Sequence, residues 1–171
     1  SDLKSSFLQG TYVGKTTLIK ALVFGGTEKT YQAWYGVDAA TLESDRTFNA
    51  AGMFTDEAGN TRFYDNQTDN YQQDHYQLHW NEKISENWST NLAFHYTKGK
   101  GYYEEYQEDQ NFADYGLKPI TAAPTVNTTD LVRQKWLDND FYGTTFSANY
   151  KKEKLDLIFG GAYNRYEGDH F

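Results

Sequence analysis

The sequence contains no cysteine and no long run of apolar residues, and its 24 acidic residues outnumber 16 basic ones. The lack of cysteine excludes a disulfide framework and thiolate chemistry. No segment approaches the ~20 consecutive apolar residues that a membrane-spanning helix requires. A formal net charge of −8 provides no basic surface for nucleic acid, and acidic segments would repel its phosphates. We therefore expect neither a transmembrane helix nor a nucleic-acid partner.

Aromatic residues, by contrast, make up 18 % of the 171 residues, with 15 Tyr, 11 Phe and 4 Trp. Disordered chains are poor in aromatic residues, so we expect a folded domain. The hydrophobic content of 38 % and the mean hydropathy of −0.85 are nevertheless low for a packed soluble core. A polar chain rich in tyrosine and tryptophan is typical of a membrane β-barrel, which has a wet interior and aromatic girdles around its lipid-facing band.

Alternation of apolar and polar residues predicts β-strands. It is clearest in residues 88–97, where Trp88, Leu92 and Phe94 share one face. His95 lies on the opposite face. Other runs show the same period, and their aromatic and β-branched residues favour strands. We predict an all-β fold, an antiparallel up-and-down sheet of six long strands, with strands at about residues 5–13, 17–36, 71–84, 86–100, 138–151 and 154–167.

The connections between these strands alternate in length. Short turns are expected at residues 14–16, 81–87 and 151–154, and two long polar loops at residues 38–70 and 101–137. The two loops contain 13 acidic and 5 basic residues and so hold all the net charge. Short turns alternating with long extracellular loops are typical of bacterial outer-membrane barrels. Because the smallest such barrel has about eight strands, six would be a segment of a larger one.

The apolar stripes of these strands also suit a membrane. Each stripe has about five residues per face, which matches the roughly ten tilted residues that cross a bilayer. Trp80 and Trp88 lie near short turns, and Tyr96 and Tyr163 lie toward the long loops, in a two-girdle pattern. A soluble antiparallel sheet with one wet face would alternate in the same way. A transmembrane barrel segment and a soluble ligand-binding module, such as a lipocalin-like barrel, therefore both stay open.

Sequence motifs indicate no catalytic or metal centre. Residues 10–16 resemble a phosphate-binding loop but have three residues between the glycines where four are needed. His75 and His79 on one strand would lie roughly 13 Å apart, too far for one metal ion. Paired carboxylates such as Glu104 and Glu105 have no evident partner to tune them, so a β-sheet hydrolase is the least favoured hypothesis. We expect no enzyme activity, no catalytic residue, no metal and no cofactor.

The long loops and the strand ends beside them combine aromatic residues with hydrogen-bonding groups, notably in residues 30–36, 63–66 and 99–106. Such a composition suits recognition of a small ligand on a rigid scaffold. Packing of the loops against one another would explain it equally well. On the first interpretation, the candidate ligand-binding residues are Arg46, Tyr64, Tyr102 and Tyr103.

Four blocks carry a family resemblance: EKTYQAWYGV at residues 28–37, FYDNQTDNYQQDHYQL at 63–78, HYTKGKGYYEEY at 95–106 and YNRYEGDHF at 163–171. Across nearly the whole chain they resemble the barrel domain of TonB-dependent outer-membrane receptors of Bacteroidetes. The resemblance implies a mid-barrel piece, about a quarter of the wall, of a transporter with about 22 strands. It implies import of a scarce nutrient, such as an iron–siderophore complex or cobalamin, without fixing which one.

The same resemblance implies partners and a location. The protein would lie in the bacterial outer membrane, in contact with lipid, and would bind a small nutrient at its extracellular loops. It would contact TonB only through an N-terminal plug domain that is absent from these residues. As an isolated piece, it would have open edges at residues 5–13 and 154–167 and bare aromatic stripes. Open edges recruit other chains, so we expect the chain to self-associate or to need detergent.

Overall fold

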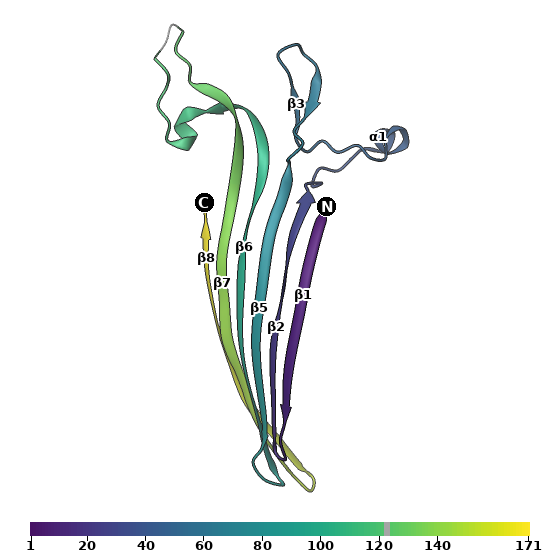
Figure 1. Ribbon diagram of the computed structural model, residues 1–171, viewed down its shortest axis with the longest axis vertical. Coiled ribbons are helices and arrows are strands. Elements are labelled where there is room, and N and C mark those ends of the chain that lie inside the picture. Colours follow the sequence, from purple (N-terminus) through teal and green to yellow (C-terminus); the bar gives the residue numbers. More distant parts are fainter. Residues whose placement is uncertain (122–123) are drawn as a thin grey trace. The chain divides into compact units, whose positions relative to one another are not determined.

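Most of the chain is β-structure in a computed structural model that describes residues 1–121 and 124–171 (Figure 1). The long strands form one antiparallel sheet in the order β1-β2-β5-β6-β7-β8, so each pairs with the next long strand along the chain. The prediction of an all-β, six-stranded antiparallel meander is therefore confirmed. The sheet is open, with β1 and β8 at its edges. Its strands are β1 (Asp2–Val13), β2 (Thr17–Tyr31), β5 (Thr68–Lys83), β6 (Trp88–Asn111), β7 (Thr128–Lys152) and β8 (Leu155–His170).

Three short turns join neighbouring strands at the same end of the sheet (Figure 1). In the β1–β2 turn, the Gly14 backbone N–H donates to the Thr17 carbonyl at 2.7 Å. In the β5–β6 turn, the Ser85 hydroxyl oxygen accepts from the Trp88 backbone N–H at 3.2 Å. The β7–β8 turn places Glu153 in the left-handed region, with φ of 51°. These local bonds let polar residues reverse the chain within a few positions.

The chain divides into two compact units. The sheet unit comprises residues 2–28, 71–101 and 136–171, and the loop unit comprises Ser1 and residues 29–70 and 102–135. Among the described residues, Ala51 and Phe112 are the two buried apolar residues, and both belong to the loop unit. The sheet unit therefore has no buried apolar core of its own in the described part of the chain.

Burial in the sheet unit is the reverse of that in a soluble sheet. On one face, called the apolar face here, Phe94, Phe146 and Phe159 are 48, 45 and 72 % exposed. On the opposite, polar face, Thr97 and Asn139 are buried. Soluble antiparallel sheets normally pack the apolar face on a core and leave the polar face in water.

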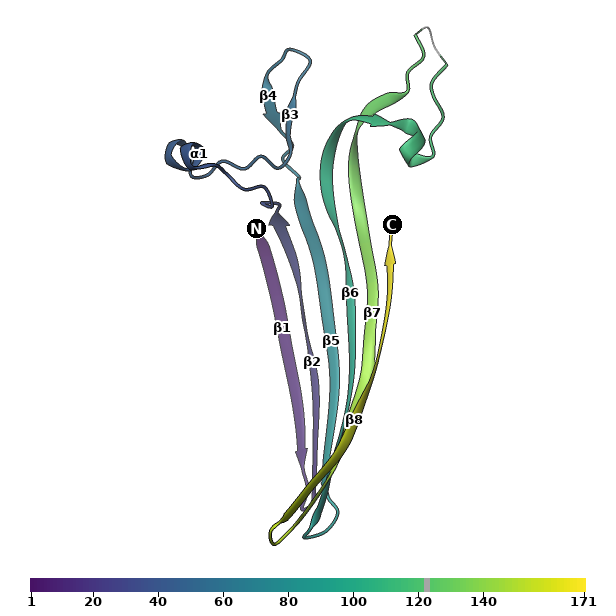
Figure 2. The same ribbon diagram turned by 180° about the vertical axis from the view of Figure 1, so that it is seen from behind.

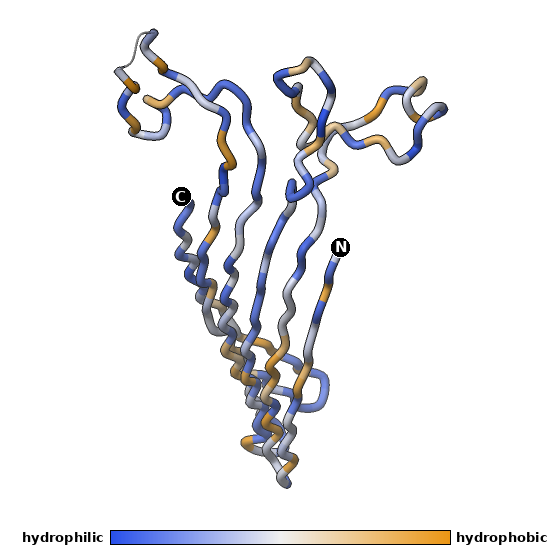
Figure 3. The backbone as a smooth tube through the Cα atoms, turned by 45° about the horizontal axis from the view of Figure 1, so that its top comes forward, coloured by the Kyte–Doolittle hydropathy of each residue, from blue (hydrophilic) through white to orange (hydrophobic). Residues whose placement is uncertain are grey.

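The apolar face carries a stripe of the same length on three neighbouring strands. It covers residues 88–96 of β6, 142–150 of β7 and 155–163 of β8, which is nine residues each. The ring centroids of Trp88 and Tyr150 are 4.9 Å apart, so aromatic contacts link the strands across this stripe. Figure 3 shows that apolar residues gather in the parts of these strands nearer the short turns.

Ion pairs bound this stripe at the end away from the short turns. The Lys98 ammonium lies 2.6 Å from Asp138 and 3.0 Å from Asp140, and the Lys100 ammonium lies 3.1 Å from Asp138. The Tyr96 hydroxyl donates to Asp140 at 2.5 Å. The four charged residues among them, Lys98, Lys100, Asp138 and Asp140, are called the charged belt below. The belt places paired charges on the apolar face directly beyond its last aromatic residue.

The loop unit contains the irregular segments. A short helix, α1 (Ala39–Ser44), starts at Asp38, whose side chain accepts from the Thr41 backbone N–H at 2.8 Å. A hairpin of β3 (Met53–Thr55) and β4 (Thr61–Phe63) forms the second sheet (Figure 2). A 3-10 turn, η1 (Phe112–Tyr115), follows β6. No helix in the described part of the chain is long and apolar enough to cross a membrane.

The structure corrects the expected extent of three segments. The loop expected at residues 101–137 is largely strand, because β6 continues to Asn111 and β7 starts at Thr128. Polar cross-strand pairs replace apolar contacts there: Arg133 pairs with Glu105 through two guanidinium nitrogens. The strand expected at residues 17–36 ends at Tyr31. Residues 38–70 contain α1 and the β3–β4 hairpin rather than only irregular loop.

Candidate functional site

A pocket of about 540 Å³ lies within the loop unit. Aromatic rings form much of its lining, polar side chains supplement them, and one arginine is present. The lining residues are Tyr31, Gln32, Ala33, Tyr35, Arg46, Thr47, Phe48, Asn49, Ala51, Phe63, Tyr64, Asp65 and Gln67. Rings beside a few hydrogen-bonding groups are the usual lining of a small-molecule site, and the volume lies in the usual range. This space is called the loop pocket below.

Gln32 holds the base of the loop pocket together. Its side chain is 2 % exposed and donates to the carbonyls of Thr68 and Glu104 at 3.2 and 3.1 Å. Its side-chain oxygen accepts from the Trp34 indole N–H at 2.9 Å, and its backbone carbonyl accepts from the Asn49 amide at 2.6 Å. Gln32, which directly follows β2, thus joins the end of that strand to β5, β6 and the segment after α1. A buried amide with all these partners is a rigid structural element.

Glu104 is the buried carboxylate of the loop unit. It accepts hydrogen bonds from the Tyr64 hydroxyl and the Asn66 amide, both at 2.5 Å, and from the Gln134 amide at 2.6 Å. Burial raises the pKa of Glu104, but the three hydrogen bonds lower it, and the net pKa lies below the ordinary value of 4.5. The expectation that Glu104 and Glu105 lack partners is therefore wrong. Both are tied into the β6–β7 region.

The four residues predicted to bind ligand fall in two places. Arg46 and Tyr64 both line the loop pocket, whereas Tyr102 and Tyr103 do not. Arg46 is exposed, and it has no ion pair or hydrogen bond within the described residues. The Tyr64 hydroxyl already donates to Glu104, and this hydrogen bond raises its pKa. Arg46 therefore offers a charge to a ligand, while Tyr64 offers mainly its ring.

Tyr103 takes part in a separate aromatic contact. Its ring meets Trp34 edge-on, with centroids 5.3 Å apart, and the Lys135 ammonium lies 5.3 Å from its centre.

Sequence reasoning missed Gln32 and Asn49 as pocket residues, although both stand among aromatic residues. An amide residue within an aromatic run only weakly predicts a pocket residue, because its burial depends on segments that are distant in sequence.

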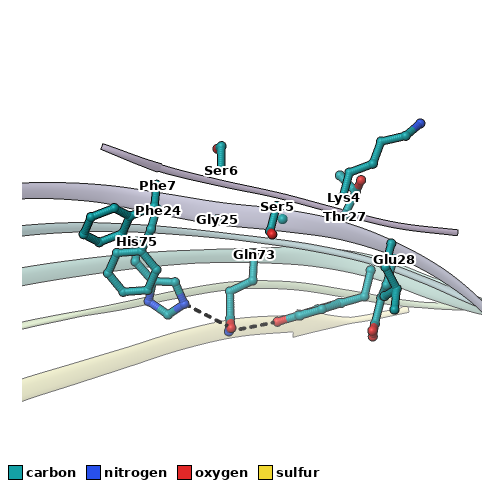
Figure 4. Close-up of a pocket in the computed structure, with 13 residues that line it drawn as sticks. Lys4, Ser5, Ser6, Phe7, Phe24, Gly25, Thr27, Glu28, Gln73 and His75 are labelled. Carbon is teal, nitrogen blue, oxygen red and sulfur yellow. Dashed lines mark hydrogen bonds between the residues drawn. The ribbon is translucent and has the colours of Figure 1, made fainter. Parts of the chain in front are cut away.

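The polar face of the sheet unit holds a second hollow of about 880 Å³ (Figure 4). It extends over Gly26 of β2, between β1 and β5, and is called the Gly26 groove below. Figure 4 shows the rings of Phe7, Phe24 and His75 at one end and Glu28 at the other. All residues that line the groove belong to the sheet unit.

His75 and His79 are each hydrogen-bonded to a glutamine of their own strand. His75 contacts Thr97 at 2.9 Å and Gln73 at 3.2 Å, and His79 contacts Gln77 at 3.2 Å. Within residues 1–121 and 124–171, no group of three or more His, Cys, Asp or Glu side chains is arranged to hold a metal ion. His75 is therefore part of the groove wall.

Comparison of the chain with protein-family models, curated proteins and solved structures finds no match. The function therefore has to be inferred from the chain's own geometry.

Proposed function

We propose that this chain is part of a TonB-dependent receptor and transporter in the bacterial outer membrane, which binds and imports a scarce nutrient such as an iron–siderophore complex or cobalamin. The single observation that carries the proposal is the exposed apolar stripe of the sheet unit. Three adjacent strands bear it over nine residues each, and ion pairs follow directly beyond its aromatic end. Membrane strands have about 9–11 tilted residues, which supports a lipid-facing role.

Physical chemistry favours lipid as the cover for this stripe. Removing apolar surface from water gains about 25 cal/mol per Å². Large contiguous apolar patches on soluble monomers are rare and mark an interaction surface. In a barrel wall, the stripe would contact hydrocarbon, the charged belt would lie at the headgroups, and the polar face would line a wet lumen. All three features of the sheet unit then have a role.

The alternative, a soluble lipocalin-like binding module, requires the opposite burial. Such a barrel turns its apolar side chains inward and presents polar ones to water. Here Thr97 and Asn139 on the polar face are buried, while Phe146 on the other face is half-exposed. The burial pattern of the sheet unit therefore supports the membrane proposal over the soluble one.

Fluorescence quenching by lipid tests this proposal. Two single-tryptophan variants are made by replacing the other three tryptophans with Phe, one keeping Trp88 of the apolar stripe and one keeping Trp34 of the loop unit. The chain is folded into liposomes that contain brominated acyl chains. Trp88 should be strongly quenched by the bromines, and Trp34 should instead be quenched by aqueous iodide. Quenching of Trp88 by iodide alone would favour the soluble module.

Within this proposal, the nutrient contacts the loop pocket, with Arg46 and Tyr64 as its contacts and Tyr102 and Tyr103 as further candidates. Coupling to TonB would require a plug domain outside these residues. In the intact receptor, Arg46→Ala should abolish growth on limiting nutrient at normal surface abundance. Arg62→Ala is the matched control, because Arg62 is an exposed arginine of the same unit that pairs with Asp56 and does not line the pocket. Equal growth of both variants would remove Arg46 from the site.

The isolated chain should also self-associate. Every described residue of β1 and of β8 is exposed, and unpaired strand edges recruit other strands. The exposed apolar stripe is a second surface that promotes self-association. Light scattering in detergent-free buffer should therefore report oligomers that detergent disperses. A stable monomer at high concentration without detergent would contradict this expectation and would favour the soluble module.

A further inference from the structure

One wall of the Gly26 groove is a directed chain of hydrogen bonds. The Gln73 side-chain oxygen can only accept, so the His75 Nε2–H donates to it at 3.2 Å. The His75 Nδ1 is hydrogen-bonded to the Thr97 hydroxyl at 2.9 Å. The Gln73 amide in turn donates to the Tyr71 hydroxyl oxygen, at a long 3.5 Å. The Tyr71 hydroxyl itself lies over Gly99 of β6, on the side of β5 away from β1, because a Cβ atom at Gly99 would collide with it.

The aromatic end of the groove is an open platform. The rings of Phe24 and His75 stack with centroids 4.5 Å apart and planes 13° apart. Phe7 of β1 lies beside Phe24, with centroids 6.2 Å apart, and its side chain is largely exposed. Because both His75 nitrogens have partners, the imidazole is held in place as a wall of the platform. An apolar or aromatic group can stack here.

The floor of the groove has no side chain. Gly26 lies between Phe24 and Glu28 on the groove side of β2. A Cβ atom there would come within 2.5 Å of the Lys4 carbonyl oxygen and 3.4 Å of the Ser5 Cβ. Close approach of β1 therefore requires glycine at this position. The result is an unobstructed path from the aromatic platform to Glu28.

Glu28 supplies an unneutralised negative charge at the far end. It is exposed and has no ion pair or hydrogen bond among the described residues. Lys4, on the neighbouring strand, points to the other side of the sheet and pairs with Asp2 at 3.3 Å (Figure 4). No other charged side chain within reach faces this groove, since its remaining lining is aromatic, small or uncharged. The potential at this end is therefore negative.

We propose that the Gly26 groove binds an organic ammonium ion that carries an aromatic or apolar ring. The ammonium pairs with Glu28, and the ring packs against Phe7 and Phe24. Rings of this kind also attract cations through their π-faces. This inference goes beyond the proposed function, because it rests on the groove alone and holds for a membrane or a soluble sheet.

The spacing of the two ends sets the length of the ligand. Phe24 and Glu28 are four positions apart on one strand, which corresponds to roughly 13 Å between their Cα atoms. Both side chains extend into the groove and shorten the distance that a ligand has to cover. A series of phenylalkylammonium ions with two-, four- and six-carbon linkers therefore measures this distance. We expect an affinity maximum within the series rather than a steady rise with apolar length.

The test is a calorimetric titration of the 171-residue chain in non-ionic detergent. The probes are 4-phenylbutylammonium, the neutral 4-phenylbutanol and the anionic 4-phenylbutanoate. We expect the ammonium to bind tightest and the carboxylate weakest, with the preference reduced by salt. Glu28→Gln should lower the affinity for the ammonium by about threefold to fivefold, as for an exposed ion pair, and leave the alcohol unchanged. Glu86→Gln, an exposed carboxylate in the β5–β6 turn, is the matched control and should bind as the parent does.

The aromatic platform is tested separately. Phe24→Leu should weaken all three probes by a similar factor, because it removes stacking rather than charge. If circular dichroism shows that this variant misfolds, Phe7→Leu at the exposed platform residue takes its place. Equal affinity for the ammonium and the carboxylate, or wild-type ammonium binding by Glu28→Gln, would overturn the proposal. Neither result would bear on the lipid quenching of Trp88, so the two proposals fail independently.

Discussion

The loop unit and the sheet unit are both rich in aromatic residues and both bury polar side chains, but among the described residues only the loop unit also buries apolar ones. The loop unit buries Phe112 and, with their partners, Gln32 and Glu104. The sheet unit buries Thr97 and leaves most of its phenylalanines exposed. Composition alone does not distinguish these solutions. The difference lies in which side chains find partners within their own unit: in the described residues, the sheet unit leaves its apolar stripe without a cover.

The largest expected effect is the loss of stability when a charge is placed on the apolar face of the sheet unit. In liposomes, Phe94→Arg should destabilise the folded chain by about 2–4 kcal/mol, the cost of an arginine at the bilayer midplane. Asn91→Arg, three positions away on the polar face of the same strand, is the control and should change the free energy of unfolding little. Heat-modifiable gel migration and urea titration measure both. Equal loss of stability in the two arginine variants would contradict the assignment of β6 to one apolar and one polar face.

Removal of the buried carboxylate should affect the loop unit alone. Glu104→Ala leaves the donors of Tyr64, Asn66 and Gln134 without their acceptor, at a cost of about 2–3 kcal/mol. Amide hydrogen exchange should accelerate in residues 102–111 and not in residues 142–150. Glu43→Ala, an exposed glutamate of α1, is the control. Faster exchange across both segments would mean that the units unfold together.

Overpacking of the polar face should affect the sheet unit in turn. A Cβ atom at Gly99 would collide with the Tyr71 hydroxyl and would lie 2.6 Å from the Asn139 side-chain oxygen. Gly99→Ala should therefore lower the free energy of unfolding by about 1–2 kcal/mol. At Gly10, also within a strand, a Cβ atom would meet nothing within 4 Å, so Gly10→Ala is the matched control. A harmless alanine at Gly99 would show that the polar face is loosely packed.

Acid should produce the smallest effect, again in the loop unit. The folded pKa of Glu104 lies below its ordinary value of 4.5, so its contribution to stability is fully present above 4.5. That contribution is lost as the pH falls through the lowered folded value. Hydrogen exchange of the Gln32 backbone N–H should therefore accelerate below pH 4.5 in the parent chain. Glu104→Gln should lack this pH dependence, and an unchanged acid response in that variant would assign it to another carboxyl.

The sequence predicts the sheet better than the loop unit for a physical reason. Alternation in residues 88–97 depends on local period alone, so strands, faces and short turns can be read from neighbouring residues. Residues 101–111 are polar on both faces, and their strand conformation depends on pairing with residues 128–135, so they were expected to be loop. The burial of Gln32 depends on Thr68 and Glu104, which are distant in sequence.

The candidate sites show the same division. Arg46 and Tyr64 were predicted from composition and do share the loop pocket. The Tyr64 hydroxyl, however, is taken by Glu104, which composition did not indicate. The Gly26 groove was not predicted at all, because it joins residues of β1, β2 and β5 whose register no local pattern specifies.

In the membrane wall that we propose, the charged belt would limit movement of the sheet unit along the membrane normal. A shift of the sheet by two residues along its strands would carry the ammonium of Lys98 and its carboxylate partners about 6–7 Å along the strand direction. In one direction these charges would enter hydrocarbon, and in the other the stripe would rise into water. Both shifts are unfavourable, so the belt would act as a depth stop that fixes the immersion of the wall to within one pair of residues.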